Sequence, residues 1–351
     1  MSNFNKYDIT PAVTTKIRHR SECIPYYHAF WSEEAGGISL AGAYLPLFTA
    51  PMACVVNENN YMEFDKNNIN VIIPRTVSYE KRLEIAKKMI WIALSLEEFE
   101  KFINEHDNLD TEHYICVDIA NGHMEDLLTL CSEAKTKFDD GIIIMAGNVA
   151  NPQTYEQYAL AGIDYIRLSI GTGSACLTNK LTGIGMDPYR LLSETVQMKK
   201  QYSDGPKIVV DGGFDSIRDI ILALAIGADY VMCGLLFCQA EEACGKKILK
   251  SFEMPIEYDA VYAGHNIIKM DKQLITREGR MYYGMSTERA QREMGNTKIK
   301  KSEGKEFWVS IEYTLKEFVD QFVAAICSSM SYCNAKTLDE YIGKQTITYR
   351  N

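Results

Sequence analysis

The chain has 351 residues, of which 46% are hydrophobic and 24% are charged, and its net charge is −10. This composition is typical of a globular protein with a large core, and an acidic chain without basic clusters is not expected to bind nucleic acid. No stretch approaches the roughly 18 apolar residues of a membrane span, and the polar N-terminal segment lacks the apolar part of a secretory signal. We therefore expect a cytoplasmic protein with neither nucleic acid nor membrane among its partners.

Eight short apolar runs recur along the first two thirds of the chain, and stretches with helical periodicity separate them. Runs that are short, rich in β-branched or aromatic residues and not alternating are typical of buried parallel strands. The predicted strands are residues 45–50, 70–73, 89–94, 114–118, 142–146, 165–170, 207–210 and 230–233. The predicted helices are residues 78–88, 96–105, 124–137, 152–161, 188–202 and 216–225.

Eight consecutive β–α units favour a closed (β/α)8 TIM barrel over a doubly wound sheet, so we expect an α/β fold. We assign residues 1–44 to an N-terminal cap, 45–250 to the barrel core, 251–310 to an insertion with a flap, and 311–351 to C-terminal helices. The insertion is expected to contain a hairpin around residues 267–277. The polar, helix-poor stretch 288–305 is either a mobile flap or a solvated surface segment.

Residues 171–185 form the richest candidate site, because four glycines and four hydroxyl residues surround Cys176 after a predicted strand. Glycine allows a ligand to approach the backbone, and nearby backbone N–H groups favour a thiolate at Cys176. A thiolate there can attack an electrophilic ring carbon, with Thr178 as a candidate proton-transfer partner. In the flap, Glu303 lies between Lys300 and Lys305, where a carboxylate could relay a proton, although such charged runs usually mean only solvation.

Glycines also follow the last two predicted strands. Asp211, Gly212 and Gly213 follow one strand, and Gly234 and Leu235 follow the next. TIM barrels commonly bind phosphate with the backbone amides of these two loops, although either loop alone could simply be a tight turn. Asp211 would repel phosphate and is better suited to accept hydrogen bonds from a ribose diol.

Six motifs, taken together and in order, resemble the IMP dehydrogenase/GMP reductase family from about residue 114 to the C-terminus. They are Met145-Ala-Gly-Asn-Val149, Gly171-Thr-Gly-Ser-Ala-Cys176-Leu-Thr178, Val210-Asp-Gly-Gly213, Gly227-Ala-Asp-Tyr-Val-Met232, Tyr283-Gly-Met-Ser286 and Ser302-Glu-Gly-Lys305.

The resemblance implies a role for each matching position. Cys176 resembles the cysteine that forms a covalent adduct at C2 of the purine, and Gly171, Gly173 and Cys176 resemble the carbonyl ligands of a potassium ion. The positions implied for the nucleotide substrate are Ser174, Asp211, Gly212, Gly213, Gly234, Leu235, Gly284, Met285, Ser286 and Lys300. Those implied for the dinucleotide cofactor are Arg20, Arg75, Asp118, Ile119, Ala120, Ile170 and Gly171.

Within the family, the compact length and the flap sequence are similar to the GMP reductase branch. The dehydrogenase branch carries an Arg-Tyr pair in the flap, and no such pair occurs in residues 283–305. The reductase branch implies reductive deamination of GMP to IMP with NADPH, with Thr178 and Glu303 transferring protons, in a homotetramer. The alternatives are IMP oxidation with NAD, a modified or deoxy purine nucleotide as substrate, and an inactive member. The departures that motivate the last alternative are Asn179 in place of Arg and Pro74-Arg75 in place of His-Lys.

Overall fold

The computed structural model describes residues 4–32, 37–262 and 265–350. Its central strands are β4 (Leu47–Thr49), β5 (Ile72–Ile73), β6 (Trp91–Leu94), β7 (His113–Asp118), β8 (Ile142–Val149), β9 (Tyr165–Leu168), β10 (Lys207–Asp211) and β11 (Tyr230–Cys233). The helices that follow them are α1 (Tyr61–Lys66), α2 (Tyr79–Ala86), α3 (Leu96–Glu105), α4 (Glu125–Phe138), α5 (Thr154–Leu160), α7 (Pro188–Lys199), α8 (Ile217–Ile226) and α9 (Leu235–Cys238).

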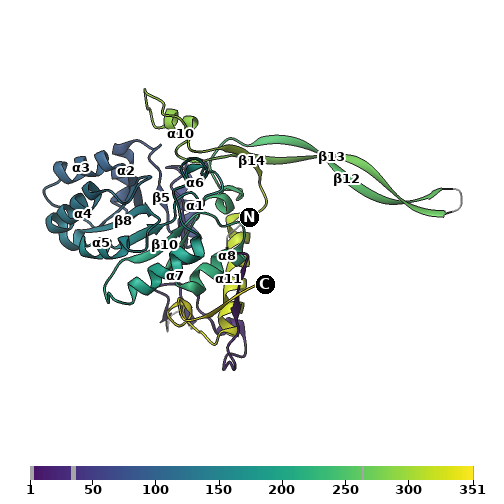
Figure 1. Cartoon of the computed structure of the whole chain (residues 1–351), viewed down its shortest axis with the longest axis horizontal. Helices are drawn as coiled ribbons and strands as arrows, with labels where there is room; N and C mark the ends of the chain where they lie inside the picture. The colour runs from purple at the N-terminus through teal and green to yellow at the C-terminus, as the bar shows by residue number, and fades with distance from the viewer. Residues whose placement is uncertain (1–3, 33–36, 263–264, 351) are drawn as a thin grey trace.

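The eight strands form one parallel sheet in the order β4-β11-β10-β9-β8-β7-β6-β5. Hydrogen bonds between β4 and Asn70, two residues before β5, close the sheet: the Thr49 amide donates to the Asn70 carbonyl at 2.9 Å, and the Asn70 amide donates to the Leu47 carbonyl at 3.0 Å. The chain therefore folds as the predicted (β/α)8 barrel, with its helices around the sheet (Figure 1).

Local sequence signals set most of the helix starts. The Ser78 and Ser216 hydroxyls accept hydrogen bonds from the amides of Lys81 and Asp219, as N-caps do, and Pro188 occupies the first turn of α7. Strand β6 starts two residues later than predicted, because Met89 has a φ of +61°, which does not fit a strand.

The hydrophobic core has two parts, one inside the barrel and one between the strands and the surrounding helices. Large side chains such as Phe48, Trp91, Met145 and Tyr230 fill the barrel interior, and the alternate residues of the same strands pack against the helices. A filled interior means that the barrel is not a pore, and that ligands bind at its ends.

The segment before β4 contacts the amino end of the barrel through Tyr27. The Tyr27 ring lies 4.9 Å from the Tyr230 ring, and its hydroxyl donates to the Asp229 carbonyl. The C-terminal part of the chain forms α11 (Leu315–Tyr332), α12 (Leu338–Tyr341) and then strand β15 (Thr346–Tyr349). Strand β15 pairs with β1 (Tyr7–Thr10). The C-terminal region is thus not purely helical, which corrects the prediction for residues 311–351.

The insertion is larger than predicted. Strands β12 (Ile248–Tyr262) and β13 (His265–Tyr283) form a twisted ribbon that reaches far from the barrel, and β14 (Glu306–Ser310) pairs with its base (Figure 1). The predicted hairpin at residues 267–277 is therefore too short, and the insertion begins at Ile248 rather than at residue 251. Pro255 is compatible with β12, because β12 is an edge strand, where proline is tolerated.

The flap segment contains a helix that the sequence did not predict, α10 (Glu288–Glu293). The Thr287 hydroxyl caps it by accepting from the Ala290 amide at 3.3 Å, and Arg289 pairs with Glu293 one turn later at 3.1 Å. The helix was missed because caps and charge pairs stabilise it, without the apolar periodicity on which the prediction relied.

Candidate active site

A cleft of about 220 Å³ opens at the carboxyl ends of the barrel strands. Most of its wall comes from the carboxyl ends of the barrel strands and the loops after them, and the rest from the end of β13 and the segment after it, where Gly284, Met285 and Ser286 lie. Predicted site residues that line the cleft are Asp118, Ala120, Ile170, Gly171, Gly173, Cys176, Thr178, Asp211, Gly212, Gly234, Gly284, Met285 and Ser286. Residues that are far apart in the sequence, from Ala50 to Ser286, thus line one cleft, as expected at the carboxyl end of a TIM barrel.

The three predicted catalytic residues form a connected chain of contacts. Cys176 is partly exposed in the cleft, and its Sγ lies 3.4 Å from the Thr178 hydroxyl. The Thr178 hydroxyl donates its own proton to Glu303 Oε2 at 2.8 Å. Its oxygen lone pairs are therefore free to accept the proton of the Cys176 thiol. This geometry allows a proton to pass from Cys176 through Thr178 to the Glu303 carboxylate.

The flap is fixed to the Cys176 loop through its backbone. The Leu177 amide donates to the Glu303 carbonyl at 2.7 Å, and the Lys305 amide donates to the Ala175 carbonyl at 2.9 Å. Gly304 fits closely here, because an added Cβ would lie 2.9 Å from the Ser286 hydroxyl oxygen. Residues 302–305 therefore hold Glu303 against Thr178, as expected for a closed flap.

Two glycines of the cleft, Gly171 and Gly212, allow close contacts between backbone segments because they have no side chain. Gly171 has a φ of +78°, and a Cβ there would lie 2.4 Å from the Cβ of Asn179. Gly212 also has a φ of +78°, and a Cβ there would lie 3.1 Å from the Cα of Gly173. Both positions need glycine for conformation and for space, so the loops after β9 and β10 can form one continuous wall.

Arg167 lies at the floor of the cleft and was not predicted. Its side chain is 4% exposed and its guanidinium bridges two carboxylates, Asp118 at 2.7 Å and Asp211 at 2.8 Å. The Asn148 amide also donates to Asp211 Oδ2 at 2.8 Å. Asp211 is therefore held in one orientation by two donors on the same oxygen, which prepares it to accept hydrogen bonds from a diol.

Asp118 has a second cationic partner, since Arg75 Nε lies 3.1 Å from its Oδ2. Burial alone would raise the pKa of Asp118, but the charges of Arg75 and Arg167 outweigh it and hold the pKa below its ordinary value. Asp118 is therefore ionised at neutral pH. Arg75, predicted as a cofactor contact, reaches the cleft through this carboxylate.

The remaining predicted positions divide into two groups. Ser174, Gly213, Leu235 and Ile119 are chain neighbours of lining residues. Lys300 and Arg20 lie apart from the cleft: Lys300 is exposed and its backbone bonds to the Gln291 side chain, while Arg20 lies in η1 (Arg20–Glu22), beside α11. Within this chain, the structure does not bring these two residues to Cys176.

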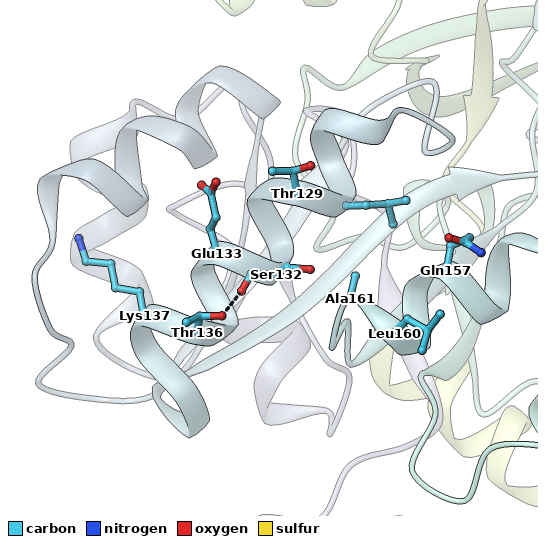
Figure 2. A pocket seen from close by; sticks show the side chains of 9 residues that line it. Thr129, Ser132, Glu133, Thr136, Lys137, Gln157, Leu160 and Ala161 are labelled. Atoms are coloured by element: carbon cyan, nitrogen blue, oxygen red, sulfur yellow. Dashed lines mark hydrogen bonds between the residues drawn. The ribbon is translucent and has the colours of Figure 1, made fainter.

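A roomier cavity of about 640 Å³ lies outside the barrel, between α4 and α5 (Figure 2). Its wall carries Thr129, Ser132 and Thr136, and the hydroxyls of Thr129 and Thr136 already donate to helix carbonyls. It contains no nucleophile with a neighbouring base, so it is not the candidate active site.

Cys176 is expected to be the first thiol modified by iodoacetamide. Of the ten cysteines, only Cys176, Cys244 and Cys333 are partly exposed. Burial raises the pKa of the other two thiols, that of Cys244 to about 12, so their thiolates are scarce at a pH of about 8. Peptide mapping after brief labelling checks this expectation, and faster labelling of Cys244 or Cys333 would contradict it.

Residues 45–350 match the model of the IMP dehydrogenase / GMP reductase domain. The chain belongs to the IMP dehydrogenase/GMP reductase family. It is similar to a protein named GMP reductase from Shouchella clausii, with 27% identity over 100% of this chain and 97% of that protein. A GMP reductase from Clostridium acetobutylicum is 28% identical over 84% of this chain and 82% of that protein.

Family members named for the other activity match a shorter part of the chain. The inosine-5′-monophosphate dehydrogenase of Chlorobaculum tepidum is 30% identical over 64% of this chain and 43% of that protein. Family membership makes this chain one of a group of purine nucleotide oxidoreductases. Among the described residues, we find no helix with the length and apolar character to span a bilayer.

Proposed function

We propose that this chain is a GMP reductase-like enzyme, which converts GMP to IMP and ammonia with NADPH. The observation that carries the proposal is the contact chain of Cys176, Thr178 and Glu303 in a cleft walled by glycine loops. A nucleophile, a relay and a carboxylate at these distances are the parts required for covalent catalysis with proton transfer.

The proposed reaction begins with attack of the Cys176 sulfur on C2 of the guanine ring, which forms a carbon–sulfur bond. The bond between C2 and the amino group then breaks, and the amino group leaves as ammonia after taking a proton from the Thr178–Glu303 pair. Hydride addition to C2 and loss of the sulfur release IMP. In total, GMP, NADPH and two protons give IMP, NADP⁺ and ammonium.

The residues around Cys176 are suited to hold the nucleotide. Asp211, oriented by Arg167 and Asn148, would accept hydrogen bonds from the ribose, and the amide of Gly234 would face the phosphate. Positioning of this kind supplies a large part of a rate enhancement, since it replaces a bimolecular encounter with a fixed geometry.

The nicotinamide ring of the cofactor would lie next to the purine in this proposal. Asp118, Ala120, Ile170 and Gly171 line the same cleft as Cys176, on the side of the loops after β7 and β9. NADPH bound there would supply the hydride for C2. This chain's residues would orient the ring and exclude water, and the closed flap would cover the reacting atoms.

We also propose that the enzyme binds a potassium ion and assembles as a homotetramer. The carbonyls proposed for potassium, those of Gly171, Gly173 and Cys176, all lie in the Cys176 loop, where the Gly173 carbonyl also accepts the Cys176 amide at 2.9 Å. Oxygen donors alone suit a cation of this kind.

Two assays separate this function from the dehydrogenase alternative. With GMP and NADPH, absorbance of the reduced cofactor should fall as ammonia and IMP appear in equal amounts. With IMP and NAD, absorbance should stay unchanged. A rise in the second assay with no fall in the first would overturn the proposal, and GMP-dependent thermal stabilisation with neither change would indicate an inactive member.

Glu303→Gln is expected to lower kcat by about 10²-fold with little change in the KM for GMP. The amide cannot take up or return a proton, although it can still accept a hydrogen bond from Thr178. The matched control is Glu306→Gln, three residues on in β14, where the side chain pairs at the surface with Arg289. Equal kcat values for the two variants would remove Glu303 from the proton path.

A further inference from the structure

Ser169 and Thr172, which were not predicted as site residues, form a pair of hydroxyl groups in the wall of the Cys176 cleft. Ser169 Oγ lies 2.7 Å from Thr172 Oγ1. The Ser169 hydroxyl donates to the main-chain carbonyl of Asp211 at 2.6 Å, and Thr172 Oγ1 lies 3.2 Å from the same carbonyl oxygen. The pair therefore connects the start of the Cys176 loop to Asp211, the residue that would bind the ribose.

The backbone of Ser169 has a conformation that favours glycine. Strand β9 ends at Leu168, and Ser169, the next residue, has a φ of +104°. Residues other than glycine rarely adopt such a φ, and those that do are concentrated at functional sites. Glycine would fit here without strain, but it has no hydroxyl to donate. The two contacts of its hydroxyl thus explain why a serine stands at this position.

Asp211 stands where the main chain has little restraint of its own. It is the last residue of β10, and Gly212 and Gly213 follow it with φ values of +78° and +86°. Consecutive glycines leave the chain free to move, because they lack side chains that restrict the backbone. Arg167 and Asn148 hold the carboxylate of Asp211, whereas the hydroxyl pair holds its main chain. Together these contacts fix the residue at both of its ends.

Asn148 adds a second connection between Ser169 and Asp211. Its side-chain nitrogen donates to the Ser169 carbonyl at 3.1 Å and to Asp211 Oδ2 at 2.8 Å. A side-chain amide has two N–H donors, so it can make both bonds at once. Ser169 thus contacts the Asp211 main chain through its hydroxyl and the Asp211 carboxylate through Asn148.

We propose that Ser169 and Thr172 are positioning residues for the nucleotide substrate. This proposal rests on the proposed function, in which the Asp211 carboxylate accepts hydrogen bonds from the ribose hydroxyls. The paired hydroxyls keep Asp211 at a fixed place relative to the Cys176 loop, so that a bound ribose brings the purine to the sulfur. A misplacement of about 1 Å in such a site can cost about 10²-fold in rate, so a tether of this kind has a measurable effect.

Affinity for nucleotides with and without ribose hydroxyls tests the proposal. GMP and 2′,3′-dideoxy-GMP differ only in the two groups that Asp211 would bind, so the ratio of their Kd values reports on that carboxylate. Wild-type protein should bind GMP at least about tenfold more tightly than the dideoxy nucleotide. In the double variant Ser169→Ala/Thr172→Val, the Kd for GMP should rise at least about tenfold, and that for the dideoxy nucleotide less than about threefold. Equilibrium dialysis measures both.

Two single variants separate the hydroxyl of Ser169 from its backbone. Ser169→Ala and Ser169→Gly should bind GMP more weakly than the wild type and within about twofold of each other, because both lack the hydroxyl. Ser169→Gly should unfold at the higher urea concentration of the two, since glycine adopts the positive φ without strain. Wild-type affinity for GMP in Ser169→Gly would show that the hydroxyl has no positioning role.

The matched control is Ser193→Ala/Thr195→Val in α7, where both hydroxyls donate to helix carbonyls, at 2.7 and 2.8 Å, and neither lines the cleft. Its Kd values should stay within about twofold of the wild type. An equal loss of affinity for the two nucleotides in the Ser169→Ala/Thr172→Val variant, or equal affinity for them in the wild type, would overturn the positioning role. GMP binding by the wild type without turnover would instead contradict the proposed reaction, and failure to bind GMP would overturn both.

Discussion

Cys176→Ala is expected to lower turnover of GMP by at least about 10³-fold while leaving the Kd for GMP within about threefold. Without sulfur, no covalent bond to C2 can form. The Thr178 and Glu303 side chains and the glycine loops stay in place, because alanine fills part of the same volume in a partly exposed position. Turnover is measured by cofactor absorbance and affinity by equilibrium dialysis.

The matched control for this variant is Cys333→Ala. Cys333 is also partly exposed, but it lies at the end of α11 and does not line the cleft. Its replacement should leave turnover unchanged. Deamination by Cys176→Ala at the wild-type rate would exclude a thiolate mechanism, and loss of GMP binding together with turnover would show that the variant tests folding rather than chemistry.

Arg167→Met is expected to destabilise the protein by about 3–5 kcal/mol at neutral pH. The substitution removes the cation between Asp118 and Asp211 and leaves two carboxylates facing a buried apolar side chain. A typical domain is stable by only about 5–15 kcal/mol, so a loss of this size should be plain in urea unfolding. Arg190→Met is the control, since Arg190 forms an exposed pair with Glu194 and should change stability by less than about 1 kcal/mol.

The loss in Arg167→Met should depend on pH. In the wild-type protein the pKa of Asp118 is lowered, so its contribution to stability is present above the unfolded pKa and is lost as the pH falls through the folded pKa. Without Arg167 the Asp118 carboxylate loses one of the two cations that lower its pKa, so it binds a proton more readily, and its protonation relieves the repulsion with Asp211. The difference between variant and wild type should therefore be smaller at a pH of about 5 than at a pH of about 7. A larger difference at acid pH would contradict this account of Arg167.

The barrel could be predicted because the strands are short, mostly apolar runs that recur eight times with helical stretches between them, a pattern typical of buried parallel strands in an α/β barrel. The partners of Cys176 could be named for a different reason: Thr178 is near in sequence, and Glu303 was identified by the family motif around it. Sequence spacing alone would not have joined Glu303 to Thr178, which is 125 residues away.

Arg167 was missed because it interrupts the apolar run of β9 and was treated as part of an ordinary strand. The signal was present, since a charged residue in a buried strand needs opposite charges, and Asp118 and Asp211 stand at the carboxyl ends of two other predicted strands of the same barrel. The length of the β12–β13 ribbon gave no such signal, because its stability depends on cross-strand pairs that no local pattern specifies. The binding roles of Lys300 and Arg20 were assigned by resemblance alone, and this chain by itself does not place them in the cleft.

The most direct test is to look for the bond between Cys176 and the purine. The enzyme, in excess over GMP labelled with ¹⁴C in the ring, is mixed with NADPH, quenched in acid at successive times within one turnover, and digested. We predict that label appears transiently on the peptide containing Cys176 and never on protein from Cys176→Ala. Formation of IMP and ammonia at the full rate with no label on the protein at any time would contradict covalent catalysis.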